Sequence, residues 1–204
     1  MAGLRERKKQ ATSRRIVEKA TRLFLKNGYE ETRIEDVAAE AELSIQTFYN
    51  YFASKADILL AIIADETEMV LAKGGKTILR PHADAAVAFH ELVKTYYSNS
   101  FSATTRQMWR IAMARVMSDP TAEFSRGYIA LDKQFTVQVV HFLTRMQSAG
   151  LIRSDVDPGS LGELLFNNVS LNFMEHVRGE TKTIDEALAT VRRQCAPVFQ
   201  MVVP

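Results

Sequence analysis

An all-α protein is predicted by three features of this 204-residue sequence. Apolar residues recur at intervals of three and four, the spacing of one helix face. Alternation of apolar and polar residues, which marks a half-buried strand, is almost absent. Glycine, proline and N-cap residues separate the periodic stretches. We therefore expect about nine helices.

The first part of the chain predicts three short helices followed by a long one. The first helix has an apolar face of Ile16, Ala20, Leu23 and Phe24. Asn27-Gly28 ends this helix in the manner of a glycine cap. A capping box of Thr32 with Glu35 is predicted to start the second helix. Ser44 is the predicted N-cap of the third helix, and Ser54 with Asp57 is predicted to cap the fourth. We expect the third helix to reach about Tyr51 and the fourth to span about 54–73.

Gly74-Gly75 and Pro81 mark the end of the fourth helix and the start of a second region. Its longer periodic segments predict helices at about 82–100, 104–117, 121–148, 159–178 and 184–200. Asp119-Pro120 and Asp157-Pro158 each pair an N-cap residue with proline at a first helical position. We expect residues 1–55 to form one domain, with the fourth helix as a connection, and residues 75–204 to form the other.

Positive charge is concentrated at the N-terminus. Residues 1–26 carry nine basic side chains against two acidic ones, a net charge of +7, so the remaining residues carry −5 of the overall +2. A basic arm on a mildly acidic body suits a polyanion such as DNA. A solvated tail that only aids solubility would have the same composition.

Other classes of function have little support. The longest apolar run, Ile58 to Ala64, is seven residues, whereas a membrane span needs about 18. The basic N-terminus is not followed by the apolar segment of a secretory signal. Cys195 is the one cysteine, and the four histidines lack metal-ligand spacing. We expect a cytoplasmic protein without catalytic residues, metal or cofactor.

Residues 32–55 have the layout of a helix-turn-helix, with Ala41-Glu42-Leu43 as the turn. Gln46 and Thr47 fall in the first turn of the second helix, where glutamine can pair with adenine and a threonine methyl can pack on thymine. The hydroxyls of Tyr49 and Tyr51 and the charge of Lys55 suit phosphate contacts. Phe48 and Phe52, four residues apart, are expected to face inward.

The segment from Ile16 to Leu59 resembles the N-terminal domain of TetR-type repressors. The resemblance lies in Gly28-Tyr29, Thr32-Arg33-Ile34, Val37-Ala38, Ala41, Leu43-Ser44, Thr47-Phe48-Tyr49-Asn50-Tyr51-Phe52 and Ser54-Lys55. It implies that the DNA-contacting positions are Thr32, Arg33, Ser44, Ile45, Gln46, Thr47, Tyr49, Asn50, Tyr51 and Lys55. Ala53 stands where many relatives have proline, and Ile45 stands where many have a small or basic residue.

The resemblance further implies a homodimer that binds an inverted-repeat operator in double-stranded DNA, and a repressor that a small-molecule effector releases. The second region is rich in aromatic and methionine side chains, which suit a hydrophobic or aromatic effector. The expected lining is Phe89, Val93, Tyr97, Trp109, Met113, Tyr128 and Phe135. In the alternative, these residues are core, and the region serves dimerisation or binds a protein partner.

Overall fold

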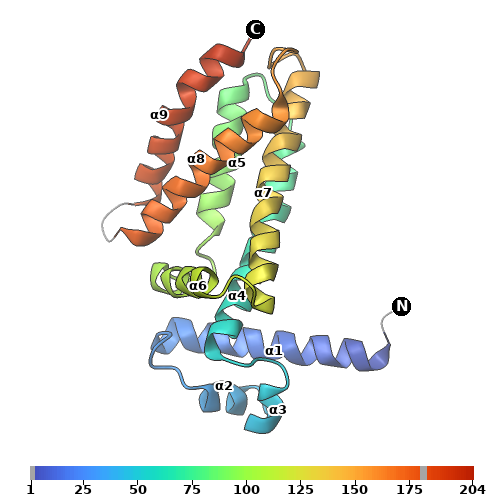
Figure 1. Cartoon of the computed structure of the whole chain (residues 1–204), viewed down its shortest axis with the longest axis vertical. Coiled ribbons are helices and arrows are strands. Elements are labelled where there is room, and N and C mark those ends of the chain that lie inside the picture. The colour runs from blue at the N-terminus through green and yellow to red at the C-terminus, as the bar shows by residue number, and fades with distance from the viewer. Residues whose placement is uncertain (1–2, 180–182) are drawn as a thin grey trace. The chain divides into compact units, whose positions relative to one another are not determined.

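The computed structural model describes residues 3–179 and 183–204, and these form nine α-helices and no strand (Figure 1). The helices are α1 (Leu4–Asn27), α2 (Ile34–Glu40), α3 (Ile45–Tyr49), α4 (Lys55–Ile78), α5 (Ala85–Asn99), α6 (Arg106–Ser118), α7 (Glu123–Ser148), α8 (Pro158–Arg178) and α9 (Ile184–Val202). The predicted all-α class is confirmed. Within the described ranges, none of these helices is both long and apolar enough to cross a membrane.

The chain divides into two compact units. The first comprises the residues up to Asp65 together with 103–128, and the second comprises 66–102 and 129–204. Helix α6 and the start of α7 therefore belong to the same unit as α1, α2 and α3. The sequence predicts two domains, residues 1–55 and 75–204, joined by the fourth helix, and this assignment of functional domains stays a prediction.

Helix α1 begins much earlier than its apolar face. It starts at Leu4, so the basic arm is helical, as its arginines, lysines and glutamine favour. The predicted face is buried, with Ile16 and Ala20 fully enclosed. Gly28 has a φ of 91° and donates its N–H to the carbonyl of Phe24, which confirms the predicted glycine cap.

The capping box predicted for Thr32 and Glu35 is wrong. Helix α2 begins at Ile34, and its N-cap is Arg33, whose backbone N–H donates to Oδ2 of Asp36 at 3.4 Å. Thr32 is 1% exposed, and its Oγ1 donates to the carbonyls of Gly28 at 2.8 Å and Leu23 at 3.3 Å. Its hydroxyl satisfies the carbonyls at the end of α1, so it is not free to cap the next helix.

Aromatic rings connect the two chain segments of the first unit. Phe48 and Phe52 are both buried, as predicted, with ring centroids 6.4 Å apart. Phe52 also stacks on Phe124 from α7, at 5.5 Å between centroids. The core beneath α3 therefore includes a side chain from more than 70 residues further along the chain.

Helices α5, α8 and α9, with parts of α4 and α7, enclose the core of the second unit. The hydroxyl of buried Tyr97 on α5 donates to the carbonyl of Val169 on α8 at 2.7 Å. Asn168 and Asn172 on α8 both donate to Oε1 of Gln194 on α9. The predicted N-cap of α8 is confirmed, because Asp157 accepts from the backbone N–H groups of Gly159 and Ser160.

The prediction that Gly74-Gly75 ends the fourth helix is wrong, because α4 continues to Ile78. A Cβ at Gly74 would lie 2.3 Å from Oε1 of Gln138 and 2.6 Å from Cε1 of Tyr96. These two side chains hydrogen-bond to each other at 2.8 Å, and Nε2 of Gln138 donates to the carbonyl of Leu71 at 2.9 Å. Gly74 thus allows a close approach between helices.

We expect Gly74→Ala to lower the free energy of unfolding by about 1–3 kcal/mol, because the added methyl group displaces Gln138 and Tyr96. Gly75→Ala is the matched control, since its Cβ would meet Nε2 of Gln138 at an ordinary 3.6 Å. Alanine favours a helix over glycine by roughly 0.5–1 kcal/mol, so this control should gain stability. Urea unfolding of both variants measures the effect, and equal stabilisation by both would contradict the packing role of Gly74.

Candidate nucleic-acid interface

A tight turn connects α2 to α3. Glu42 adopts a φ of 56°, in the left-handed region, and the N–H of Leu43 donates to the carbonyl of Ala38 at 2.9 Å. Phe48 is fully buried on the inner side of α3. Because Phe48 packs into the core, the opposite side of α3 is open to solvent.

Ser44 caps α3 and orders its first turn. Its Oγ accepts from the backbone N–H of Thr47 at 3.1 Å, which confirms the predicted N-cap. The Oγ of Ser44 and Oγ1 of Thr47 also hydrogen-bond at 2.8 Å. Because the Thr47 hydroxyl is engaged by Ser44, the Thr47 methyl group is the part left free for an apolar contact.

Five predicted contact residues have exposed side chains on or beside α3. They are Ser44, Ile45, Gln46, Tyr49 and Asn50. Tyr49 is held edge-on against Phe48, with centroids 5.7 Å apart and planes at 89°, while 49% of its surface stays accessible. Gln46 makes no hydrogen bond within the described part of the chain, so its amide is available to a partner.

Arg33 and Thr32, predicted as contacts at the start of α2, have different surroundings. Arg33 has an exposed side chain whose Nε lies 3.5 Å from Oε2 of Glu35, a weak surface ion pair. Thr32 is buried with its hydroxyl turned toward the end of α1. The structure therefore gives Thr32 a packing role, and a contact through its side chain would require that it first leave this site.

Lys55 has a structural role that the sequence did not reveal. Its ammonium donates to three backbone carbonyls between α1 and α2, those of Tyr29 at 2.8 Å, Glu30 at 3.1 Å and Thr32 at 3.2 Å. The same Nζ lies 4.4 Å from the centre of the Tyr29 ring. Burial raises the pKa of Tyr29 to about 12, so the ring stays neutral beneath the cation.

An ammonium group has three N–H donors, and the carbonyls of this loop accept all of them. Contact of Lys55 with a phosphate stays a prediction, and it would compete with these bonds. We infer that Lys55 mainly fixes the loop that positions α2 and α3.

We expect Lys55→Met to lower the free energy of unfolding by about 1–3 kcal/mol, because three carbonyls lose a charged donor while the apolar stem is kept. Lys26→Met, at an exposed position in the last turn of α1, is the control and should stay within about 0.5 kcal/mol. Thermal or urea unfolding without DNA is the measurement. Unchanged stability of Lys55→Met would return Lys55 to the set of phosphate contacts.

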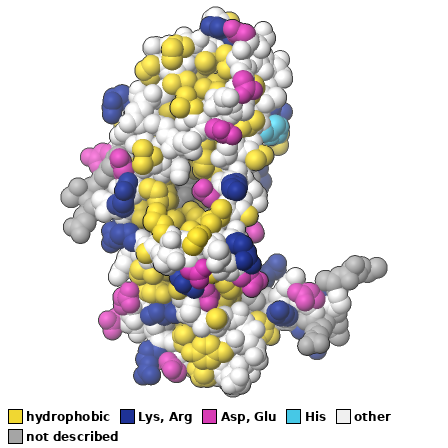
Figure 2. Space-filling model, viewed as in Figure 1, with side chains coloured by type: hydrophobic (Ala, Val, Ile, Leu, Met, Phe, Trp, Pro, Cys, Tyr) yellow, Lys and Arg dark blue, Asp and Glu magenta, His cyan; other side chains and the backbone are white. Residues whose placement is uncertain are grey.

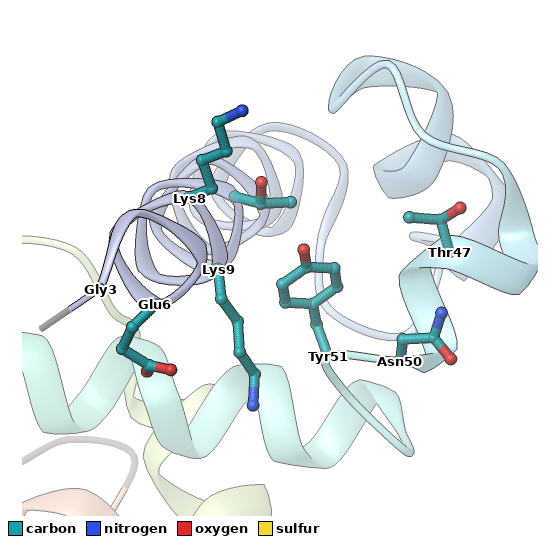
Figure 3. Close-up of a pocket in the computed structure, with 8 residues that line it drawn as sticks. Gly3, Glu6, Lys8, Lys9, Thr47, Asn50 and Tyr51 are labelled. Atoms are coloured by element: carbon teal, nitrogen blue, oxygen red, sulfur yellow. The ribbon is translucent and has the colours of Figure 1, made fainter.

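A wide cleft of about 1190 Å³ lies between the start of α1 and the end of α3 (Figure 3). The lining on one side is Glu6, Lys8, Lys9 and Thr12 of α1 with Gly3 just before that helix, and on the other side it is Thr47, Asn50 and Tyr51. Figure 3 shows the Tyr51 ring between the two elements. Three predicted contact residues therefore share this cleft with two lysines.

Lys8, Lys9 and Thr12 were not predicted as site residues, although the basic character of their segment is evident in the sequence. From Glu6 to Arg15 no side chain of α1 is buried, and Ile16 is the first that is. These ten residues correspond to about 15 Å of helix without a buried side chain, and only Thr12 and Ser13 among them are half-buried. The side chain of Arg5, another of the basic residues of this segment, lies outside the described residues. A basic helical segment without large apolar side chains is the sequence signal that could have identified the cleft.

The predicted effector residues fall into two groups. Trp109, Met113 and Tyr128 belong to the first unit, where Nε1 of Trp109 donates to Oγ1 of Thr104 at 2.9 Å and its ring meets Tyr128 at 6.2 Å. Phe89, Val93, Tyr97 and Phe135 belong to the second unit. Of these, Phe89, Val93 and Tyr97 are at most 2% exposed, in the core. A pocket formed by all seven stays a prediction.

Metal binding has no candidate in residues 3–179 and 183–204, where no group of three or more histidine, cysteine, aspartate or glutamate side chains could hold an ion. Cys195 is buried, and burial raises its thiol pKa to about 11. A thiol with such a pKa is a poor nucleophile at neutral pH.

Residues 16–62 match the family model "Bacterial regulatory proteins, tetR family". The HTH-type transcriptional regulator TcmR of Streptomyces glaucescens is 40% identical over 34% of this chain, a match that spans 31% of TcmR. The HTH-type transcriptional repressor DhaR of Mycobacterium sp. (strain GP1) is 26% identical over 74% of each chain.

Solved structures share the fold over nearly the whole chain. A TetR-family transcriptional regulator from Pectobacterium atrosepticum superposes with a TM-score of 0.68 at 16% identity, covering 96% of both chains. A protein from Saccharomonospora viridis in complex with choline superposes with a TM-score of 0.68 at 22% identity, covering 96% of this chain and 99% of that one.

Proposed function

We propose that this chain is a transcriptional regulator of the tetR family of bacterial regulatory proteins. In this proposal it is a dimeric repressor which a small hydrophobic or aromatic molecule releases from its operator. The observation that carries the proposal is the exposed face of α3 beside a cleft lined by lysines of α1. Polar side chains on a short helix can read base edges, and cations beside them can hold phosphates.

The division of roles follows from side-chain chemistry. Gln46 is exposed and can pair bidentately with adenine, while the Thr47 methyl group can pack on thymine. Lys8 and Lys9 lie on α1, beside the exposed face of α3 and not on it, and their positive charge suits the DNA backbone. Tyr51, between them and α3, can donate its hydroxyl to a phosphate.

Exposed apolar side chains support dimerisation through the second unit. Leu164 and Leu171, seven residues apart on α8, are 58% and 55% exposed, and residues at that spacing share one helix face. Figure 2 shows apolar side chains on the surface of this unit. A two-fold dimer would present two recognition helices to half-sites about 10 bp, or a multiple of it, apart.

Two helices could transmit effector binding to the DNA-binding unit. Helices α4 and α7 each contribute residues to both units. The stacked pair Phe52 and Phe124 places the start of α7 against the core beneath α3. A shift in either helix would therefore act on the elements that position α3. The S. viridis relative binds choline, which is consistent with a small-molecule effector for this chain.

A second candidate function keeps DNA binding but gives the second unit a different role. The packing of Phe89, Val93 and Tyr97 in its core favours a unit that serves dimerisation or binds a protein partner. A ligand that displaces the operator would decide against this candidate.

We expect Gln46→Ala to weaken DNA binding by about 1–3 kcal/mol at the base pair that Gln46 contacts and to relax the base preference at that position.

The double variant Lys8→Gln with Lys9→Gln should weaken binding to all DNA sequences, and it should reduce the slope of log K against log salt by about one for each phosphate that is no longer neutralised. Fluorescence anisotropy at several salt concentrations, on operators recovered by selection from genomic fragments, measures both.

Lys76→Gln with Arg80→Gln, two exposed cations of the second unit, is the charge-matched control. It should leave the salt slope unchanged. A monomer that binds an isolated half-site as tightly as the inverted repeat would refute the dimeric part of the proposal.

We expect a hydrophobic or aromatic effector to lower operator affinity about a hundredfold, which requires ~2.7 kcal/mol of coupling between the two sites. Trp109, the one tryptophan of the chain, contacts Tyr128 of α7, so its fluorescence should respond to movement there. Candidate ligands are titrated while Trp109 fluorescence and operator affinity are followed separately. Saturating ligand that leaves operator affinity unchanged would rule out release and favour the second candidate function.

A further inference from the structure

A groove of about 410 Å³ runs between α5 and α9, both in the second unit. Residues 86–94 line it from α5, and residues 191–199 line it from α9. The lining residues recur at intervals of three and four on each helix, so each helix presents one continuous face. The volume is within the usual range for small-molecule sites, roughly 300–1000 Å³.

The floor of the groove is apolar and made of buried core residues. Phe89, Val191 and Phe199 line it and are each at most 3% exposed. The rings of Phe89 and Phe199 are 5.4 Å apart. Cys195 adds a neutral thiol, whose Sγ lies 3.6 Å from Oδ1 of Asn168. The floor therefore suits an apolar group and holds no charge.

The rim is positively charged. Lys94 and Arg192 line the groove from the two helices, are exposed, and form no ion pair within the described residues. Burial lowers the pKa of His90, and the charges of Arg192 and Lys94 lower it further, so both cations act on this imidazole. Glu91 is the acid of the rim, and its Oε2 lies 3.9 Å from Nδ1 of His82.

His90 supplies a polar atom without a partner. Its Nδ1 is enclosed and makes no hydrogen bond in the described part of the chain. Buried polar atoms are seldom left unpaired, and those that are require an explanation. Because Nδ1 is enclosed, it is not open to a group bound at the rim, so the cations Lys94 and Arg192 are the groups that remain to hold an anion there.

We propose that the groove between α5 and α9 binds an amphipathic monoanion, a carboxylate with an apolar tail. The tail lies on Phe89, Val191 and Phe199, and the carboxylate accepts from Lys94 and Arg192. The charge at the rim selects this occupant over a neutral or cationic molecule of the same shape. Of the residues predicted to line the effector pocket, only Phe89 lines this groove. Binding of the monoanion here is proposed whether or not a ligand releases the protein from DNA.

The probes are octanoate, octanol and octylamine, which share an apolar tail and differ in charge. Isothermal titration calorimetry on the full chain should give binding of octanoate at least about tenfold tighter than that of octanol, with octylamine weaker still. Lys94→Gln and Arg192→Gln should each weaken octanoate binding about 2–5-fold, and the double variant roughly tenfold. Arg193→Gln, an exposed cation of α9 outside the groove, should leave it within about twofold.

Ala86→Leu fills the groove without removing charge and should abolish octanoate binding while operator affinity persists. Octanol that binds as tightly as octanoate would overturn the proposal, as would octanoate affinity unaffected by the double variant and by Ala86→Leu. If Ala86→Leu instead dissociates the dimer in sedimentation, a second copy occupies the groove and the proposal is wrong. Absence of operator binding in the wild type would reject the proposed function and leave these outcomes unchanged.

Discussion

The hydrogen bonds of the Lys55 ammonium group are the interaction on which the geometry of α2 and α3 in the first unit depends. The loop between α1 and α2 leaves several carbonyls outside any helix, and three of them accept from this one group. Buried or half-buried carbonyls require partners, and a cation supplies them more strongly than a neutral donor. Because Lys55 is also the first residue of α4, the loop before α2 and the helix after α3 are fixed to each other.

Local features of the unit agree with this constraint. Tyr29 lies under the ammonium and packs edge-on against Phe24, at 5.0 Å between centroids. Thr32 closes the end of α1 from the same loop. The loop therefore has a polar side occupied by Lys55 and an apolar side set into the core. Such a loop holds α2 and α3 in one orientation, and a recognition surface needs this preorganisation to contact DNA without a large entropic cost.

The sequence predicts the elements well because helix formation depends mostly on residues close together in the chain. The face of Ile16 and Ala20, the caps at Gly28, Ser44 and Asp157, and the inward Phe48 all follow from spacing within a few residues. The helix start predicted at Asp119-Pro120 is wrong, because Asp119 is the C-cap of α6 and α7 begins at Glu123. Two other errors concern contacts that spacing does not report. Gly74 looks like a helix terminator because its neighbours Gln138 and Tyr96 are distant in sequence. Thr32 looks like a cap because nothing in the sequence shows that its hydroxyl reaches back to the end of α1.

Some residues of the candidate site could likewise be predicted from the sequence, and others could not. The exposure of Gln46 and Tyr49 follows from the periodicity of α3, so these residues could be predicted. The role of Lys55 could not, since a lysine at the start of a helix looks the same whether it contacts phosphate or backbone carbonyls. The effector residues were predicted from composition alone, and composition does not reveal that Trp109 and Phe89 belong to different compact units.

The stacking of Phe52 on Phe124 affects how the protein folds during synthesis. The first unit is discontinuous, because residues 103–128 complete a core that the first 65 residues begin. Closing the loop over the intervening segment costs entropy that only the finished core returns. When the helix-turn-helix leaves the ribosome, Phe52 lacks this neighbour until the start of α7 has been translated, and domains with such late partners expose apolar surface on the way. The core of the first unit is therefore complete only after more than half of the chain has been made, when the start of α7 has been translated.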